Sequence, residues 1–284
     1  GWLGRAAELG GVPAINTGHP GDRAAYVAGT GLKQRLPLIG SCDVMISNFG
    51  TNDLNAGALT LAQAQPHIIN VWRAGFARGT RVYQTTLGPW VTSSDDYSTV
   101  ENQALTTSPT TVSAKMAAFN AWLFDGAPLN FPAYTAAATG ASGAGVIRIG
   151  HANHPLVGVI DLISILESSP GSGKWKVGRT VTDAVITNGS RTVTSASAAF
   201  TADEVTARQN IVIQGIGGGS TMVNARLNTR ASGTSIDYDG TSPSSQSATG
   251  RKLVIGGYTT DGGHPSIRGH QEIAAVMEAV LPTL

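Results

Sequence analysis

The chain has 284 residues, which is enough to bury a sizeable hydrophobic core as one domain or as two. Its 19 Lys and Arg nearly balance its 18 Asp and Glu, and no basic run is interleaved with aromatic residues, so the composition argues against a nucleic-acid-binding protein. The single Cys42 excludes an internal disulfide framework. The sequence contains no run of about eighteen apolar residues, so it predicts no membrane-spanning helix.

Helix-like and strand-like spacing of apolar residues alternates along the first part of the chain. The first ten residues are predicted to be helical. After them, the pattern predicts strands over residues 12–16, 43–49, 81–87 and 156–162, and helices over residues 66–77 and 112–124. Helices that alternate with strands are typical of a parallel sheet covered on both faces. The expected fold class is therefore α/β, with a flavodoxin-like doubly wound parallel sheet in three layers, α/β/α.

The composition changes after Pro170, where Thr, Ser and Gly become frequent and short β-branched runs replace the helical pattern. We expect an inserted small all-β domain over residues 178–256, with the α/β domain made of residues 1–177 and 257–284. The segment 194–203 resembles small β modules of phage tail and cell-surface proteins, which favours a secreted or phage- or cell-surface-associated protein.

The insert is also mildly basic. Residues 171–258 hold nine Lys or Arg against five Asp or Glu. This charge fits contact with an anionic polysaccharide, and it fits a solvated β surface equally well.

An Asp and a His stand three positions apart, before a helix expected over residues 271–281. Asp261 can hold one ring nitrogen of His264 and fix its tautomer, so that the other nitrogen can accept a proton from a nucleophile. Gly262 and Gly263 allow a turn tight enough to bring the two side chains together. By itself, such a pair is more often a solvated loop histidine beside an aspartate.

Two earlier sequence blocks favour a catalytic role for the Asp261–His264 pair. Residues 16–22 read Asn-Thr-Gly-His-Pro-Gly-Asp, residues 50–53 read Gly-Thr-Asn-Asp, and each block lies at the end of an expected strand. Together and in this order, the three blocks resemble those of the SGNH (GDSL-type) serine hydrolases.

This resemblance implies a role for each matched residue. Gly21 and Asn52 would form the oxyanion hole, where removal of one hydrogen-bond donor costs roughly 3 to 4 kcal/mol of transition-state stabilisation. Asp261 and His264 would be the acid and the base of a catalytic triad. Asp53 is expected to brace its loop through hydrogen bonds to the backbone.

Two further side chains are candidates for substrate contact. His19 lies within the expected oxyanion loop, and Trp90 follows the strand expected over residues 81–87. Each has a structural alternative, because His19 fits an ordinary loop residue and Trp90 fits the hydrophobic core.

The nucleophile block of the family, a Gly-Asp-Ser, has no match in the chain. Because Gly1 stands in place of an initiator Met and the first residues already read as the middle of a helix, we expect this block upstream of Gly1. Ser142 lacks the preceding strand and the glycine spacing of a nucleophile elbow, and Ser266 is expected to cap or begin a helix. The chain alone is therefore expected to be inactive.

No metal and no cofactor is expected. His151 and His154 could reach one ion from a helical turn, but Gly150 and Pro155 predict a loop, and no third ligand is nearby. Both histidines are expected to be exposed loop residues.

The expected function is serine ester hydrolysis, in which the full-length protein removes a short acyl group from a carbohydrate or a small ester. Lipid and thioester substrates fit the same blocks. The alternative is a non-catalytic module that binds carbohydrate, or part of a phage tail or cell surface, on a hydrolase-like scaffold.

Overall fold

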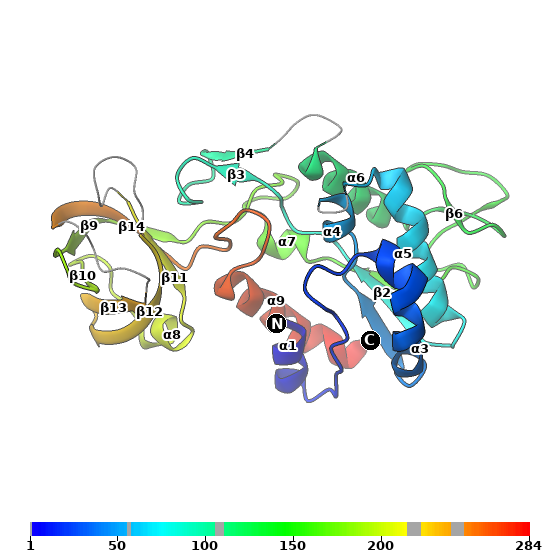
Figure 1. Ribbon diagram of the computed structural model, residues 1–284, viewed down its shortest axis with the longest axis horizontal. Coiled ribbons are helices and arrows are strands. Elements are labelled where there is room, and N and C mark those ends of the chain that lie inside the picture. Colours follow the sequence, from blue (N-terminus) through cyan, green and yellow to red (C-terminus); the bar gives the residue numbers. More distant parts are fainter. Residues whose placement is uncertain (1, 56–57, 106–110, 215–222, 240–246) are drawn as a thin grey trace. The chain divides into compact units, whose positions relative to one another are not determined.

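The computed structural model describes the chain except for residues 1, 56–57, 106–110, 215–222 and 240–246 (Figure 1). The chain divides into two compact units, each with its own hydrophobic core. The sheet unit consists of Val12–Trp90, Thr106–Ile165 and Leu281–Leu284. The barrel unit consists of Gly1–Gly11, Val91–Leu105 and Leu166–Val280.

The sheet unit contains short strands between helices. Its helices are α2 (Ala24–Tyr26), a π-helical turn (Val27–Gly31), α3 (Leu32–Ile39), α4 (Thr51–Leu54), α5 (Leu61–Phe76), α6 (Val112–Phe124) and a 3-10 turn (Leu281–Thr283), with α7 (Ile163–Leu166) at the boundary of the unit. Its strands are β1 (Val44–Ser47), β2 (Arg81–Thr85), β5 (Leu129–Asn130), β6 (Thr135–Ala136), β7 (Val146–Ile147) and β8 (Gly158–Ile160).

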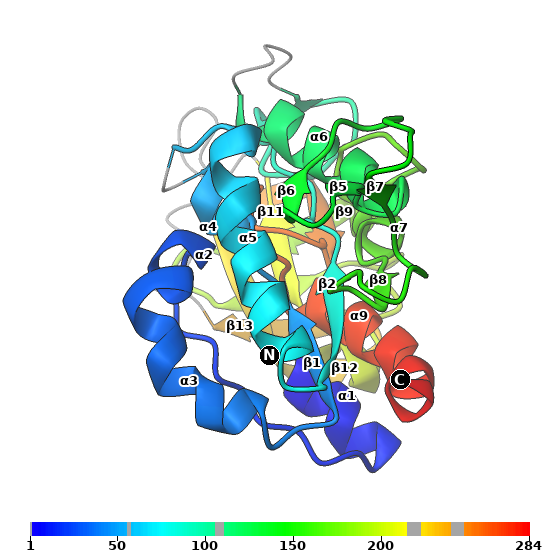
Figure 2. The same ribbon diagram turned by 90° about the vertical axis from the view of Figure 1, so that its right-hand side faces the viewer.

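Three parallel strands in the order β1-β2-β8 form the main sheet of this unit. Val44 pairs with Arg81, and Tyr83 pairs with Gly158. Helix α5 packs against β2, as Figure 2 shows. Strand β1 ends at Ser47, so the turn at Gly50 lies at the carboxyl end of this sheet.

The predicted flavodoxin-like, doubly wound three-layer fold is wrong. Among the described residues, the parallel sheet has three strands, and the larger β structure is a closed antiparallel barrel. Residues 12–16, predicted as a strand, form none, and Ile15 is 58% exposed, so this segment has no buried face to hold it against a sheet. The spacing of apolar residues predicted the type of most elements but not the number of strands that pair, which depends on distant segments.

The two long helices of the sheet unit begin at side-chain caps. Thr60 and Gln63 form a capping box, so α5 starts at Leu61 instead of the predicted position 66. Thr111 caps α6, whose predicted bounds are confirmed. The helices meet in the core, where the rings of Trp72 and Trp122 stack with centroids 5.5 Å apart.

The barrel closes through six antiparallel strands in the order β10-β13-β12-β11-β14-β9. These strands are β9 (Arg179–Ile186), β10 (Thr192–Thr194), β11 (Asn210–Ile213), β12 (Val223–Ser232), β13 (Ser235–Asp239) and β14 (Ala248–Ile255). Among the described strands of the barrel, closure leaves none with an unpaired edge, and the inward side chains, among them Phe200, Leu227 and Tyr238, fill the interior. Helix α8 (Ala202–Thr206) begins at a capping box formed by Thr201 and Glu204.

Two helices and a hairpin complete the barrel unit. Helix α1 (Trp2–Gly10) packs on α9 (Ile267–Val280), and α9 buries Ile273, Ala274 and Met277. Strands β3 (Thr92–Ser93) and β4 (Gln103–Ala104) form an antiparallel pair. The chain between β14 and α9 carries the Asp261–His264 pair.

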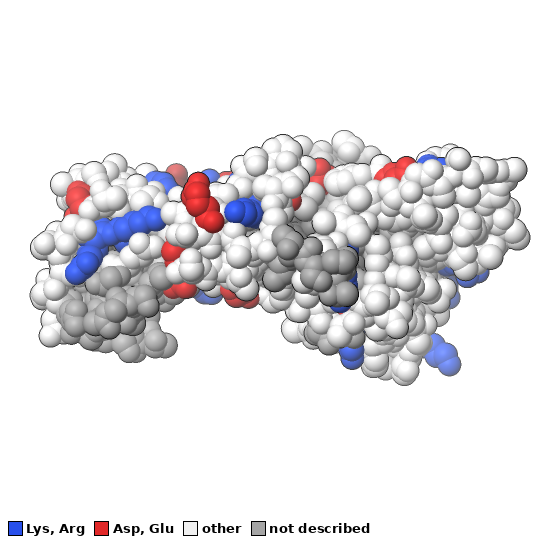
Figure 3. Space-filling model, turned by 90° about the horizontal axis from the view of Figure 1, so that it is seen from above, with Lys and Arg blue, Asp and Glu red and all other residues white. Residues whose placement is uncertain are grey.

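Charged side chains cover little of the face seen in Figure 3, where small groups of Lys and Arg and of Asp and Glu lie within a mostly uncharged surface. Within the described ranges, no helix has both the length and the apolar character needed to cross a bilayer.

Candidate functional site

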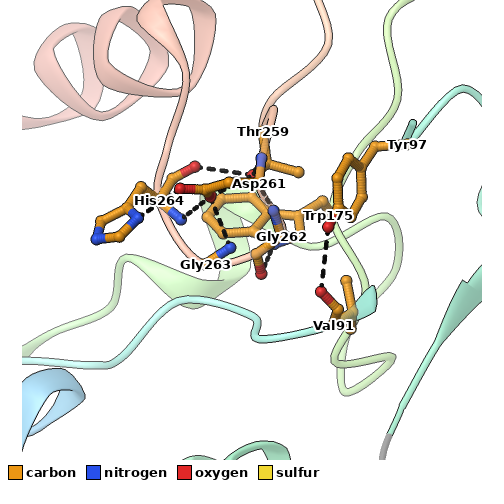
Figure 4. A network of polar contacts seen from close by, with 8 residues as sticks. All are labelled: Val91, Tyr97, Trp175, Thr259, Asp261, Gly262, Gly263 and His264. Atoms are coloured by element: carbon orange, nitrogen blue, oxygen red, sulfur yellow. Dashed lines mark hydrogen bonds and ion pairs between the residues drawn. The ribbon is translucent and has the colours of Figure 1, made fainter. Parts of the chain in front are cut away.

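The Asp261 and His264 side chains meet directly (Figure 4). The Nδ1 atom of His264 lies 2.7 Å from Oδ2 of Asp261. The second carboxylate oxygen, Oδ1, accepts the backbone N–H groups of Gly263 at 2.9 Å and of His264 at 2.8 Å. The carboxylate is therefore held by its own loop at one oxygen and presents the other to the imidazole.

The backbone of this loop requires a glycine at position 262. Gly262 has φ +78°, and a Cβ built there would lie 1.9 Å from the carbonyl oxygen of Val91. Thr259, which is buried, accepts the N–H of Gly262 at 2.9 Å and donates to the carbonyl of His264 at 2.9 Å. These contacts close the turn that brings Asp261 to His264.

The pair is accessible and the carboxylate is stabilised in its charged form. The side chains of His264 and Asp261 are 69% and 53% exposed. Partial burial raises the pKa of the Asp261 carboxyl, but hydrogen bonds from the Gly263 backbone and from His264 outweigh it, so the pKa lies below its ordinary value. Asp261 is therefore ionised at neutral pH and can stabilise an imidazolium.

The second candidate group lies in the sheet unit, around Gly21. Gly21 has φ +78°, where glycine is favoured although a Cβ would meet no atom within 4 Å. The turn is closed by the N–H of Asp22, which donates to the carbonyl of His19 at 3.1 Å, and by the N–H of His19, which donates to the Asp22 carboxylate at 2.9 Å.

The Asn52 and Asp53 side chains bind this same segment. Nδ2 of Asn52 donates to the carbonyl of Asp22 at 3.0 Å. The Asp53 carboxylate is fully buried and accepts the N–H groups of Ala24 at 2.9 Å and Ala25 at 3.0 Å. The Asp53 carboxylate therefore holds the first residues of α2, which begins three positions after Gly21. Because Asn52 contacts Asp22, Gly21 and Asn52 lie close together.

Sequence reasoning missed Arg35. Its guanidinium lies 2.6 Å from the Asp22 carboxylate, and the two side chains are only 12% and 14% exposed. Arg35 therefore fixes the carboxylate that closes the Gly21 turn. Its position on α3 gave no signal, because nothing in the local pattern links it to Asp22.

His19 and Trp90 take different positions. His19 is exposed, and Trp90 is partly buried against the core of the sheet unit. The carbonyl of Trp90 accepts the Ser113 hydroxyl.

His154 is a correction to the sequence prediction. It is 3% exposed, and its ring nitrogens contact the backbone of Leu156 and of Ala127, the latter at 2.9 Å, so it is a buried structural residue and not an exposed one. His151 is exposed. In the parts of the chain with a described structure, no three His, Cys, Asp or Glu residues are grouped so that they could hold a metal ion.

Neither serine considered as a nucleophile is placed as one. Ser266 is 8% exposed, its hydroxyl donates to the carbonyl of Gly257 at 2.5 Å, and it accepts the N–H of Gly269 in the first turn of α9. Ser142 lies in an exposed loop.

Comparisons of the chain with protein-family models, with curated proteins and with solved structures found no match. The two candidate groups belong to different compact units. Any function assigned to them therefore depends on their local chemistry.

Proposed function

We propose that the chain carries the acid, the base and the oxyanion-binding residues of a serine ester hydrolase of the SGNH type. The observation that carries this proposal is the 2.7 Å contact between Nδ1 of His264 and Oδ2 of Asp261. A carboxylate in this position selects the tautomer of the imidazole and stabilises its protonated form, which is what a general base in acyl transfer needs.

The reaction begins when a serine Oγ attacks the ester carbonyl carbon. The serine proton passes to Nε2 of His264, and Asp261 stabilises the imidazolium. The C–O bond to the leaving alcohol then breaks, and the alcohol takes that proton. Attack by water repeats the sequence on the acyl-serine and releases the carboxylic acid and the free serine.

The negative oxygen of each tetrahedral intermediate is assigned to Gly21 and Asn52. The backbone N–H of Gly21 is one donor. Nδ2 of Asn52 carries two hydrogens, and the hydrogen bond to the Asp22 carbonyl uses one of them, so the other can be donated to the substrate. Asp53 and Arg35 support this role, because Asp53 accepts the N–H groups of Ala24 and Ala25 and Arg35 pairs with Asp22, next to Gly21.

The nucleophile is assigned by resemblance to a Gly-Asp-Ser segment upstream of Gly1. The substrate class is an acylated carbohydrate or a small ester, and the accessible His264 side chain, 69% exposed, supports chemistry on a large substrate. No metal or cofactor takes part in the proposed steps.

The test compares the 284-residue chain with a longer protein that begins upstream of a Gly-Asp-Ser encoded before Gly1. With p-nitrophenyl acetate, we expect the longer protein to turn over and its His264→Ala variant to lose most of the rate. His151→Ala, which changes an exposed histidine of the sheet unit, is the matched control and should keep the rate.

Equal turnover by the His264→Ala variant would remove the base assignment. His264-dependent turnover by the 284-residue chain would show that the chain itself contains a nucleophile, which contradicts its assignment to an upstream segment. If the upstream sequence encodes no Gly-Asp-Ser, or if the longer protein that contains it turns over no ester, the hydrolase proposal fails. Glycan binding by the 284-residue chain then tests the non-catalytic alternative.

A further inference from the structure

The carbonyl oxygen of Gly262 accepts two hydrogen bonds from residues far away in the sequence (Figure 4). Nε1 of Trp175 donates to it at 2.8 Å, and the backbone N–H of Val91 donates at 3.1 Å. Trp175 is fully buried, so its indole N–H depends on this carbonyl in place of water.

One peptide links Trp175 to the Asp261 carboxylate. The carbonyl of Gly262 and the N–H of Gly263 belong to the same planar trans peptide, in which the two groups point in opposite directions. The carbonyl is held by Trp175, and the N–H donates to Oδ1 of Asp261 at 2.9 Å. Rotation of this peptide would break both hydrogen bonds, so the indole sets the direction of a donor to the carboxylate.

Trp175 is itself held in place by a second buried residue. Gln103, which is 2% exposed, accepts the backbone N–H of Trp175 at 2.8 Å and donates from Nε2 to its carbonyl at 3.0 Å. A backbone bridge to Glu167 lies on the same segment. The indole therefore has little freedom to follow the loop if the Gly262 carbonyl moves.

We infer that Trp175 is a positioning residue for the Asp261–His264 pair, which it orients through the peptide between Gly262 and Gly263. The catalytic meaning of this inference rests on the proposed function, but the coupling itself does not. After removal of the indole N–H, the Gly262 carbonyl still accepts the Val91 N–H but has lost its other donor. The peptide should then be held less firmly, which weakens the Gly263 donor to Asp261 and loosens the contact between Asp261 and His264.

The first test uses Trp175→Phe in the 284-residue chain, with carboxyl carbon-13 and ring nitrogen-15 NMR. We expect the pKa of the Asp261 carboxyl to rise toward its ordinary value and the low-field Nδ1 proton resonance of His264 to broaden or move upfield. Trp72→Phe is the matched control, because Trp72 is equally buried and donates its Nε1–H to Gln84 at 2.9 Å in the sheet unit. Changes at Asp261 no larger than those in the control would overturn the inference.

A second test does not depend on the folding of Trp175→Phe. In Asp261→Ala, which alters a half-exposed side chain, the Gly263 N–H loses its acceptor. The indole N–H of Trp175 should then exchange with solvent about fivefold faster, the effect of losing roughly 1 kcal/mol of hydrogen-bond stabilisation. Unchanged exchange would show that the two residues are not coupled.

Neither measurement requires turnover. A chain that hydrolyses no ester can still show the coupling, and a hydrolase that depends on His264 can still lack it, so the two proposals can fail separately.

Discussion

The Asp53 carboxylate accepts the backbone N–H of Ala24 at 2.9 Å, across 29 positions of sequence. It also accepts the next N–H along, from Ala25. Because α2 has only three residues, these bonds are its main N-terminal anchor and join the Gly21 segment to the Gly50 turn. In the proposed hydrolase, the oxyanion-binding residues therefore depend on the buried Asp53 carboxylate.

Asp53→Asn should destabilise the sheet unit. The amide of Asn presents a donor where the carboxylate accepts two N–H groups, so one buried N–H loses its partner, at a cost of about 2 kcal/mol. Urea unfolding followed by Trp fluorescence measures this loss. Asp43→Asn, at an exposed side chain, is the control and should change stability by no more than about 0.5 kcal/mol. Equal stability of the two variants would contradict the anchoring role.

Gly262→Ala should disrupt the Asp261–His264 contact. The residue has φ +78°, and its Cβ would lie 1.9 Å from the Val91 carbonyl, so the loop must move. Gly189→Ala is the matched control, because Gly189 has φ +76° with no atom within 4 Å of its Cβ, and should cost only about 1 kcal/mol of backbone strain. NMR shifts of the His264 ring should change in Gly262→Ala alone. If the His264 ring shifts of Gly262→Ala equal those of Gly189→Ala and of the unchanged chain, the loop tolerates a side chain at position 262.

His154 should make stability depend on pH. Burial lowers the pKa of its imidazole and outweighs the hydrogen bonds to the Ala127 and Leu156 carbonyls. The unfolded chain therefore binds more protons, so stability is present above the ordinary pKa of about 6.5 and is lost as pH falls toward the folded pKa.

The check is the slope of unfolding free energy between about pH 5 and pH 7, where an ordinary histidine titrates. His154→Gln should reduce the slope but not abolish it, because burial also lowers the pKa of His270. His151→Gln, at an exposed loop position, should leave the slope unchanged. An undiminished slope in His154→Gln would mean that His154 does not carry the effect.

Arg35→Met should destabilise the Gly21 turn, because it leaves the mostly buried Asp22 carboxylate without its cation. Breaking a buried pair costs about 3 kcal/mol, whereas Arg35→Lys keeps the charge and should lose less. Hydrogen exchange at the backbone N–H of His19, which donates to the same carboxylate, reports the turn directly. Protection that is unchanged in Arg35→Met would show that the turn holds without the pair.

Side-chain spacing in the sequence was sufficient for features that involve near neighbours. The predicted bounds of α6 are confirmed, and the strand predicted over residues 81–87 is β2. The Asp261–His264 contact was also predictable, because three positions with two intervening glycines bring the side chains within reach. In each case, a few consecutive backbone angles determine the outcome.

Only the tertiary structure decided which distant residues support those local features. The bond from Asn52 to Asp22 spans 30 positions, and the bond from Trp175 to Gly262 spans 87. The same limit explains the wrong sheet prediction, because the pattern within a strand indicates a buried face but does not indicate its neighbours. Local patterns follow from the conformational preferences of each segment, whereas partners across the fold follow from how the segments pack together.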